Sequence, residues 1–141
     1  MEIKTFNELT TKELYEILRL RAEIFVVEQN CVYQDLDGID YNSVHIFYED
    51  NGRVLAYLRF YPLDENTVSL GRVVTLYHKS GFGGKILKIG LDEIKKRFNP
   101  QTVVIHAQCQ AKGFYEKFGV KETSDVFLED EIEHIEMKLY L

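Results

Sequence analysis

Apolar residues recur at helical spacing in three parts of the chain. Thr10, with Glu13 three residues later, forms a capping box, and the apolar face that follows predicts a helix. That face consists of Leu14, Ile17, Leu18, Ala22 and Phe25. A second helix is predicted by Ile86, Leu87, Leu91, Ile94 and Phe98 and ends at Asn99-Pro100. A short third helix is expected from about Ala111 to Phe118, with Gly119 as its C-terminal stop.

The segments around these helices are rich in β-branched and aromatic side chains, which predicts strands. The expected strands are Glu2–Phe6, Val44–Glu49, Arg53–Tyr61, Thr67–Leu76, Thr102–Ala107, Val120–Leu128 and His134–Tyr140. Asn51-Gly52 predicts a hairpin turn, because both residues tolerate the positive φ angles of tight turns. The last two strands are expected to form a second hairpin.

The order of these elements is β-α-βββ-α-β-α-ββ. An antiparallel meander comes first, and the second helix then allows a parallel crossover to the next strand. The fold class is therefore α/β with a mixed sheet. Residues 1–141 contain no linker or repeat, which predicts one domain.

The stretch Glu28–Ser43 separates the first helix from the meander. It contains Asp35, Asp37, Gly38, Asp40 and Asn42, a composition typical of a long loop or a broken helix. Loops of this length in a compact domain are usually functional or mobile.

Composition and charge narrow the class of protein. A chain of 141 residues can bury roughly 68–70% of its unfolded surface without help from disulfides or metals. Seventeen basic and 23 acidic side chains give a net charge of −6, which argues against a nucleic-acid partner. The two cysteines are too few for a disulfide framework. The chain has no apolar signal segment and no run long enough to span a membrane, so we expect a cytoplasmic protein with no membrane partner.

A glycine-rich turn connects the strand Thr67–Leu76 to the second helix. Gly81, Gly83 and Gly84 allow a ligand to approach the backbone closely. The start of the helix adds unpaired N–H groups and the positive end of a dipole, a combination that binds phosphate or pyrophosphate. Lys79 and Lys85 contribute positive charge. The alternative is that the glycines only form a tight turn.

Two well-known phosphate-binding patterns do not fit this turn. The Walker pattern needs Ser or Thr after its lysine, but Ile86 follows Gly84-Lys85. The dinucleotide pattern needs a third glycine at that same position and an early βαβ unit.

The segment His78-Lys79-Ser80-Gly81-Phe82-Gly83 resembles the acyl-CoA loop of the GNAT N-acyltransferases, Gln/Arg-x-x-Gly-x-Gly/Ala, with His78 in place of Gln or Arg. Ala111–Val120 is similar to the family's A-x-x-F-Y-x-x-x-G-F stretch and departs only at Val120. The segment Leu20–Asp40 is similar to the ElaA-like subgroup. Further similarity to this subgroup lies at His45, Ala107-Gln108, Glu129-Asp130 and His134-Ile135.

This resemblance implies the GNAT fold, a mixed and mostly antiparallel sheet splayed at the cofactor site and flanked by helices. It implies acetyl-CoA as cosubstrate. The pyrophosphate would lie at Lys79, Ser80, Gly81, Phe82, Gly83, Gly84 and Lys85. The pantetheine arm would pair with the strand edge at Val73, Val74 and Thr75 like an added strand.

The implied reaction moves an acetyl group to the primary amine of a small-molecule or peptide acceptor. Tyr115 matches the family's general acid, although it could equally belong to an aromatic core face. Glu28 is the first candidate for the general base. Phe25, Gln29, Asp37, Asp40, His45 and His134 are candidates for substrate binding, and the last four are also further candidates for the base. The alternatives are that Glu28 and His134 are exposed surface residues, that His45 is a hydrogen-bonded core histidine, and that Asp37 and Asp40 only cap turns.

Three alternatives remain open. The first is a non-catalytic module that binds CoA or a partner on the same fold. The second is transfer of longer acyl groups, as in the autoinducer synthases. The third is a metal site built from Asp37, Asp40, His45 and His134, although these residues lack metal-ligand spacing and we expect no metal. An exposed final hairpin would allow a homodimer.

Overall fold

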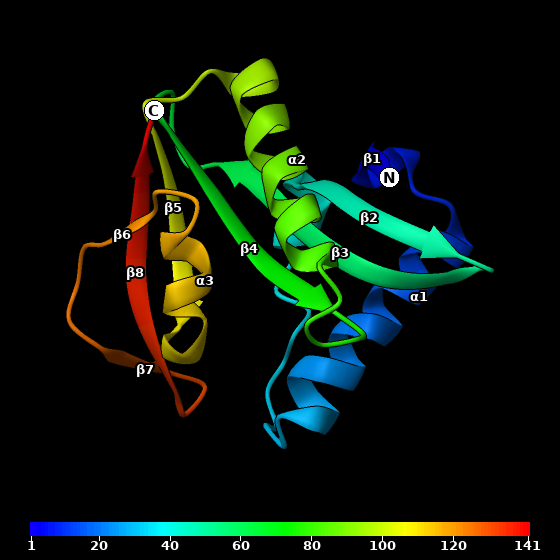
Figure 1. Cartoon of the computed structure of the whole chain (residues 1–141). Helices are drawn as coiled ribbons and strands as arrows, with labels where there is room; N and C mark the ends of the chain where they lie inside the picture. The colour runs from blue at the N-terminus through cyan, green and yellow to red at the C-terminus, as the bar shows by residue number, and fades with distance from the viewer.

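The computed structural model describes all 141 residues and contains one mixed sheet (Figure 1). Its strands are β1 (Glu2–Thr5), β2 (Val44–Asp50), β3 (Arg53–Pro62), β4 (Thr67–Thr75), β5 (Thr102–Gln108), β6 (Lys121–Glu122), β7 (Phe127–Glu129) and β8 (Ile132–Tyr140). They lie in the order β1-β2-β3-β4-β5-β8-β6, and β7 pairs with β8. Only the β4–β5 pair is parallel. The expected α/β mixed sheet is confirmed, and so is the parallel crossover through the second helix.

The local signals for helix starts and turns are confirmed. Helix α1 (Thr11–Arg21) begins at Thr10, whose hydroxyl accepts a hydrogen bond of 3.0 Å from the backbone N–H of Glu13. Asn51 and Gly52 both have positive φ angles in the β2–β3 hairpin. Helix α2 (Phe82–Phe98) ends at Asn99 in the left-handed region, and α3 (Lys112–Glu116) is shorter than expected.

The helices cover opposite faces of the sheet. Helices α2 and α3 pack on one face, where Leu58, Leu87 and Tyr115 belong to the larger core. Helix α1 packs on the other face over a smaller core that includes Leu20 and Tyr57. Figure 1 shows α1 and α2 separated by the plane of β2–β4.

The expected apolar face of α1 is partly wrong. The buried positions are Ile17, Leu20, Arg21 and Ile24, whereas Ala22 is exposed. The buried positions keep ordinary helical spacing, so the difference lies in which side of the helix faces the core. Residues Ala22–Glu28 continue the helix as a π-helical segment. Arg21 is fully buried because aspartates neutralise its charge.

Strands β4 and β5 pair only at their beginnings. Their register covers Thr67–Thr102, Val68–Val103 and Ser69–Val104, and no pairing follows. Strand β4 also contains a bulge at Arg72, whose φ is 53°, where its register to β3 shifts. The two strands therefore diverge, and the expected splay of the sheet is confirmed.

The end of the chain departs from the single strand expected over Val120–Leu128. Two short strands, β6 and β7, pair with different parts of β8, and a loop connects them. Among the helices, none has both the length and the apolar composition that crossing a membrane requires.

Candidate active site

A cavity of about 290 Å³ lies between the diverging ends of β4 and β5. It is open to solvent and is lined by both apolar and polar side chains. The residues that line it include Phe25, Gln29, Tyr33, Arg72, Val73, Val74, Thr75, His78, His106, Gln108, Tyr115, Glu129, Asp130 and His134. The splay of the sheet thus brings together residues from the first helix, the loop after it, four strands and α3.

The edge of β4 at Val73, Val74 and Thr75 has no strand partner on the β5 side. All three residues line the cavity, and the side chain of Val74 is buried in the core under α1. Their backbone N–H and C=O groups are the kind of unpaired edge to which an extended, amide-bearing chain can add. The core and binding roles of these residues are compatible, because they use different atoms.

The glycine-rich turn adopts a conformation that depends on positive φ angles. Gly81 precedes α2 with φ at 84°, and Lys79 has φ at 58°. The backbone N–H of Lys85 donates to Gly81 O, so the N–H groups of Gly83 and Gly84 lie in the first turn, before the helical hydrogen bonds begin. The turn Lys79–Lys85 therefore presents donors that suit an anion.

Tyr115 lies on α3, is 7% exposed and lines the cavity. Burial raises the pKa of its phenol, and no charged or hydrogen-bonding group of the chain contributes to that shift. The hydroxyl is therefore neutral at physiological pH and carries a proton that it can donate to a group in the cavity.

Three polar residues of the cavity lie on the face opposite Tyr115. Ile105, Ala107 and Ile135 belong to the core under α2 and α3. Since strand side chains alternate, His106, Gln108 and His134 point to the face that α1 covers. The cavity consequently has two sides, with the phenol on one and imidazole, amide and carboxylate groups on the other.

Gln29 and Gln108 connect the two walls of the cavity on this second side. Their carboxamides donate to each other, with N–O distances of 3.0 and 3.1 Å. Gln29 follows the π-helical segment, and Gln108 ends β5. Phe25 lines the same wall, so the structure places both Phe25 and Gln29 at the cavity, as expected.

Glu28 is not among the residues that line the cavity. Its carboxylate lies against Nε2 of His78 at 2.9 and 3.0 Å, and both side chains are about half exposed or more. His78 stands where the GNAT loop usually has Gln or Arg. In this chain its ring connects the glycine-rich turn to the end of the first helix.

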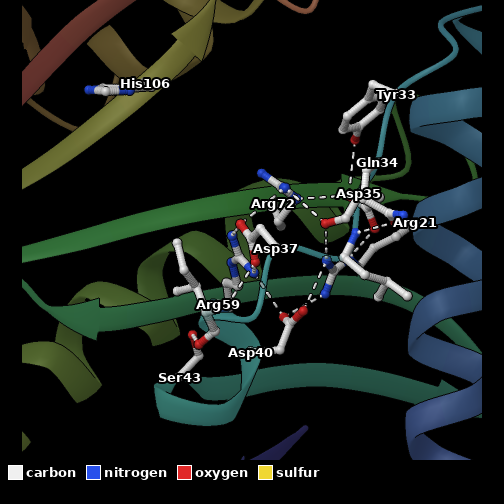
Figure 2. Close-up of polar contacts among 12 residues, drawn as sticks. Arg21, Tyr33, Gln34, Asp35, Asp37, Asp40, Ser43, Arg59, Arg72 and His106 are labelled. Atoms are coloured by element: carbon white, nitrogen blue, oxygen red, sulfur yellow. Dashed lines mark hydrogen bonds and ion pairs between the residues drawn. The ribbon is translucent and has the colours of Figure 1, made fainter.

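Asp37 and Asp40, expected to bind substrate, lie instead in a network of three arginines and three aspartates (Figure 2). The network consists of Arg21, Arg59, Arg72, Asp35, Asp37 and Asp40. Asp40 accepts from Arg21 at 2.7 Å and from Arg59 at 2.9 Å, and Asp37 pairs with Arg59 at 2.6 Å. Neither aspartate lines the cavity. Their charge is already neutralised, so the structure gives no support to either role expected of them.

The network connects the loop that contains Asp35, Asp37 and Asp40 to the sheet. Arg72, at the bulge of β4, donates to Asp35 at 2.8 Å, and the same carboxylate receives the hydroxyl of Tyr33 at 3.0 Å. Although burial alone would raise the pKa of Asp37, its contacts with Arg59 lower that pKa to about 2. The Asp37 carboxylate is therefore ionised at neutral pH.

His45 is a hydrogen-bonded core histidine, as one of the two alternatives predicted, and not the substrate-binding residue of the other. Its Nδ1 lies 2.6 Å from the hydroxyl of Tyr57, and its Nε2 lies 2.9 Å from Asp40 O. Burial lowers the pKa of His45. Of the four residues of the metal alternative, Asp37 and Asp40 pair with Arg59 and His45 faces Asp40 O, whereas His134 lines the cavity. No group of three or more His, Cys, Asp or Glu side chains is arranged to hold a metal.

Sequence reasoning missed the arginine–aspartate network and the roles of Tyr33, His106 and Glu129 at the cavity. One signal was present for the network. Arg59 interrupts an otherwise apolar stretch, and a charged residue in such a position is rarely buried without a partner, whereas Arg21, between Arg19 and Glu23, gives no such signal. The pair Glu129-Asp130 is a point of similarity to the subgroup, but that similarity assigns it no role at the site.

Comparison with known proteins identifies relatives of this chain along its whole length. The family model for the Acetyltransferase (GNAT) domain matches residues 9–141. A UPF0039 protein of Schizosaccharomyces pombe is 42% identical, with 98% of this chain and 95% of the relative covered. The protein ElaA of Escherichia coli is 35% identical, with 93% and 90% covered.

Solved structures agree with these relatives. An acyl-CoA N-acyltransferase from Pseudomonas aeruginosa has a TM-score of 0.90 at 36% identity, with 97% of each chain covered. E. coli ElaA has a TM-score of 0.90, with 97% of this chain and 96% of that chain covered. An aminoglycoside 6'-N-acetyltransferase complexed with coenzyme A shares the fold, with a TM-score of 0.77 at 14% identity.

Proposed function

Because the chain belongs to the GNAT acetyltransferase family, we propose that it moves an acetyl group from acetyl-CoA to a primary amine by direct transfer. The observation that carries this proposal is the unpaired edge of β4 opening onto a cavity that Tyr115 lines. The glycine-rich turn that begins α2 would receive the pyrophosphate. The residues present therefore fit an acyl-CoA.

When bound, acetyl-CoA supplies a thioester whose carbonyl carbon accepts the amine nitrogen. The residues of the chain then have two tasks. Tyr115 donates its phenolic proton to sulfur as the carbon–sulfur bond breaks. A base on the other side of the cavity removes a proton from the amine. The exposed pair of Glu28 with His78 makes Glu28 a weaker candidate for that base than the sequence alone implied.

Binding and turnover of acetyl-CoA test this function. At CoA concentrations one hundred times Kd, a ligand that binds only the native state stabilises it by about 2.7 kcal/mol, which thermal unfolding detects. Release of free CoA thiol with a panel of primary amines measures turnover. An unchanged melting temperature at saturating CoA contradicts the proposal. Binding without turnover for any amine supports the alternative, a non-catalytic CoA-binding module.

Replacing Gly81 by alanine is expected to weaken CoA binding by roughly tenfold or more. A side chain at φ 84° costs about 1–2 kcal/mol, and relaxing that strain turns the N–H donors of the turn away from the pyrophosphate. Calorimetric titration with CoA measures the effect. Gly113→Ala is the matched control, because Gly113 has an ordinary φ and open space around its Cβ position. Equal affinities in the two variants would contradict a role for the turn.

A further inference from the structure

His134 and Glu129 place two hydrogen-bond acceptors next to each other at the cavity. His134 is held by β8, and Glu129 by β7, which pairs with it. Nε2 of His134 lies 3.5 Å from a carboxylate oxygen of Glu129, and both residues line the cavity. In the β7–β8 register, Glu129 faces Ile132 and Phe127 faces His134, so both acceptors point to the same face of the hairpin.

The protonation of His134 follows from its other nitrogen. Nδ1 lies 2.8 Å from the carbonyl oxygen of Ile132, which can only accept, so Nδ1 carries the hydrogen. In the neutral ring, Nε2 is then an acceptor, and it has no hydrogen-bond donor within the chain. The side chain of His134 is 9% exposed and lines the cavity, so a donor for this nitrogen has to come from solvent or from a molecule bound in the cavity.

With the ring neutral, Nε2 and the Glu129 carboxylate are two acceptors 3.5 Å apart, and a donor from a bound molecule can satisfy both. A primary ammonium group has three donors and a positive charge, so it can bind Nε2 and the carboxylate at once. Other basic groups near the carboxylate do not supply this donor. His106 is the second ring beside Glu129, at 3.8 Å, and it also faces Glu136.

We propose that His134 and Glu129 bind the acceptor as a primary alkylammonium ion and that Nε2 of His134 takes its proton. This inference rests on the proposed acetyl transfer and names the acceptor's charge state and the base. The site lies on the face of the sheet that α1 covers, whereas Tyr115 lies on the other. The amine therefore reaches the thioester from one side, and the thiolate leaves toward the other.

The protons balance in this arrangement. Nε2 of His134 takes one proton from the ammonium ion and passes it to solvent. The neutral nitrogen forms its bond to the carbonyl carbon, the carbon–sulfur bond breaks, and Tyr115 gives its proton to sulfur. A second nitrogen proton, lost as the amide forms, restores the phenol. The products are the N-alkylacetamide, CoA thiol and one proton in solution.

Comparing two nucleophiles of different charge distinguishes a role of His134 as the base from a purely structural role. Propylamine is an ammonium ion at neutral pH and needs the base, whereas hydroxylamine is already neutral. His134→Gln is expected to lower kcat/KM for propylamine by roughly 10²–10⁴-fold while changing that for hydroxylamine by no more than about threefold. Equal losses with both nucleophiles overturn the assignment of His134 as the base. CoA-dependent thermal stabilisation, measured on the same variant, confirms that it is folded.

Glu129→Gln is a second test that does not disturb a buried residue. We expect it to weaken binding of propylamine to the CoA-bound protein by roughly 10- to 100-fold, because the charge-assisted hydrogen bond is lost. Glu131→Gln is the matched control, since Glu131 lies in the same turn but does not line the cavity. Unchanged propylamine affinity in Glu129→Gln, or no propylamine binding by the unaltered protein, overturns the ammonium site. The proposed function fails separately, if CoA itself does not bind.

Discussion

Replacing Arg21 by methionine is expected to lower the free energy of unfolding by about 3–5 kcal/mol. Arg21 is fully buried and donates to Asp35 at 2.8 Å and to Asp40 at 2.7 Å. Without it, three aspartates of the network face only two arginines, and one negative charge is buried without compensation. Methionine fills much of the volume, so lost packing contributes little. Urea unfolding followed by circular dichroism measures the difference.

The control for this prediction lies two residues earlier on the same helix. The side chain of Arg19 is 50% exposed and pairs with Glu16, so Arg19→Met is expected to change stability by less than about 0.5 kcal/mol. A second readout separates charge from packing. A surplus buried carboxylate has a raised pKa in the folded variant, so its cost grows as pH rises. The deficit of Arg21→Met should therefore be larger at pH 8 than at pH 5, and a pH-independent deficit would point to packing.

The sequence predicts those parts of the fold that local chemistry decides. The capping box at Thr10, the turn at Asn51-Gly52 and the stop at Asn99 each depend on a few neighbouring residues, and each is confirmed. The π-helical segment Ala22–Glu28 has no comparable signal, because seven residues are too few to distinguish its period from that of an α-helix. The bulge at Arg72 also has no signal in the sequence, since arginine has no preference for a positive φ.

The cofactor side and the acceptor side of the site also differ in how far the sequence predicts them. The cofactor side depends on a contiguous glycine motif, so the turn around Gly81 could be found by reading along the chain. The acceptor side is assembled by tertiary contacts between elements far apart in sequence. Asp40 shows the consequence, because the sequence made it a candidate for substrate binding. Its partners, Arg21 and Arg59, each lie 19 residues away and reach it only in the folded chain.

Tyr115→Phe is expected to lower kcat for acetyl transfer by roughly 10²–10⁴-fold and to leave the KM for acetyl-CoA nearly unchanged. Phenylalanine fills the same space in the core, and the hydroxyl makes no contact with a charged or hydrogen-bonding group of the chain. The variant should therefore unfold at nearly the same temperature as the unaltered protein. A loss of activity without a loss of stability or cofactor affinity isolates the proton of the phenol as its cause.

Steady-state kinetics of thiol release measure this effect, and Tyr140→Phe provides the control. Tyr140 is 65% exposed near the end of β8 and does not line the cavity, so removing its hydroxyl should change neither kcat nor KM. Burial has two opposing consequences for Tyr115. Burial keeps the phenol protonated, so a proton is available to donate. Burial also disfavours the phenolate, so transfer of this proton to sulfur must accompany the departure of the thiolate. An unchanged kcat in Tyr115→Phe would assign Tyr115 to the core alone and would mean that solvent supplies the proton to the departing thiolate.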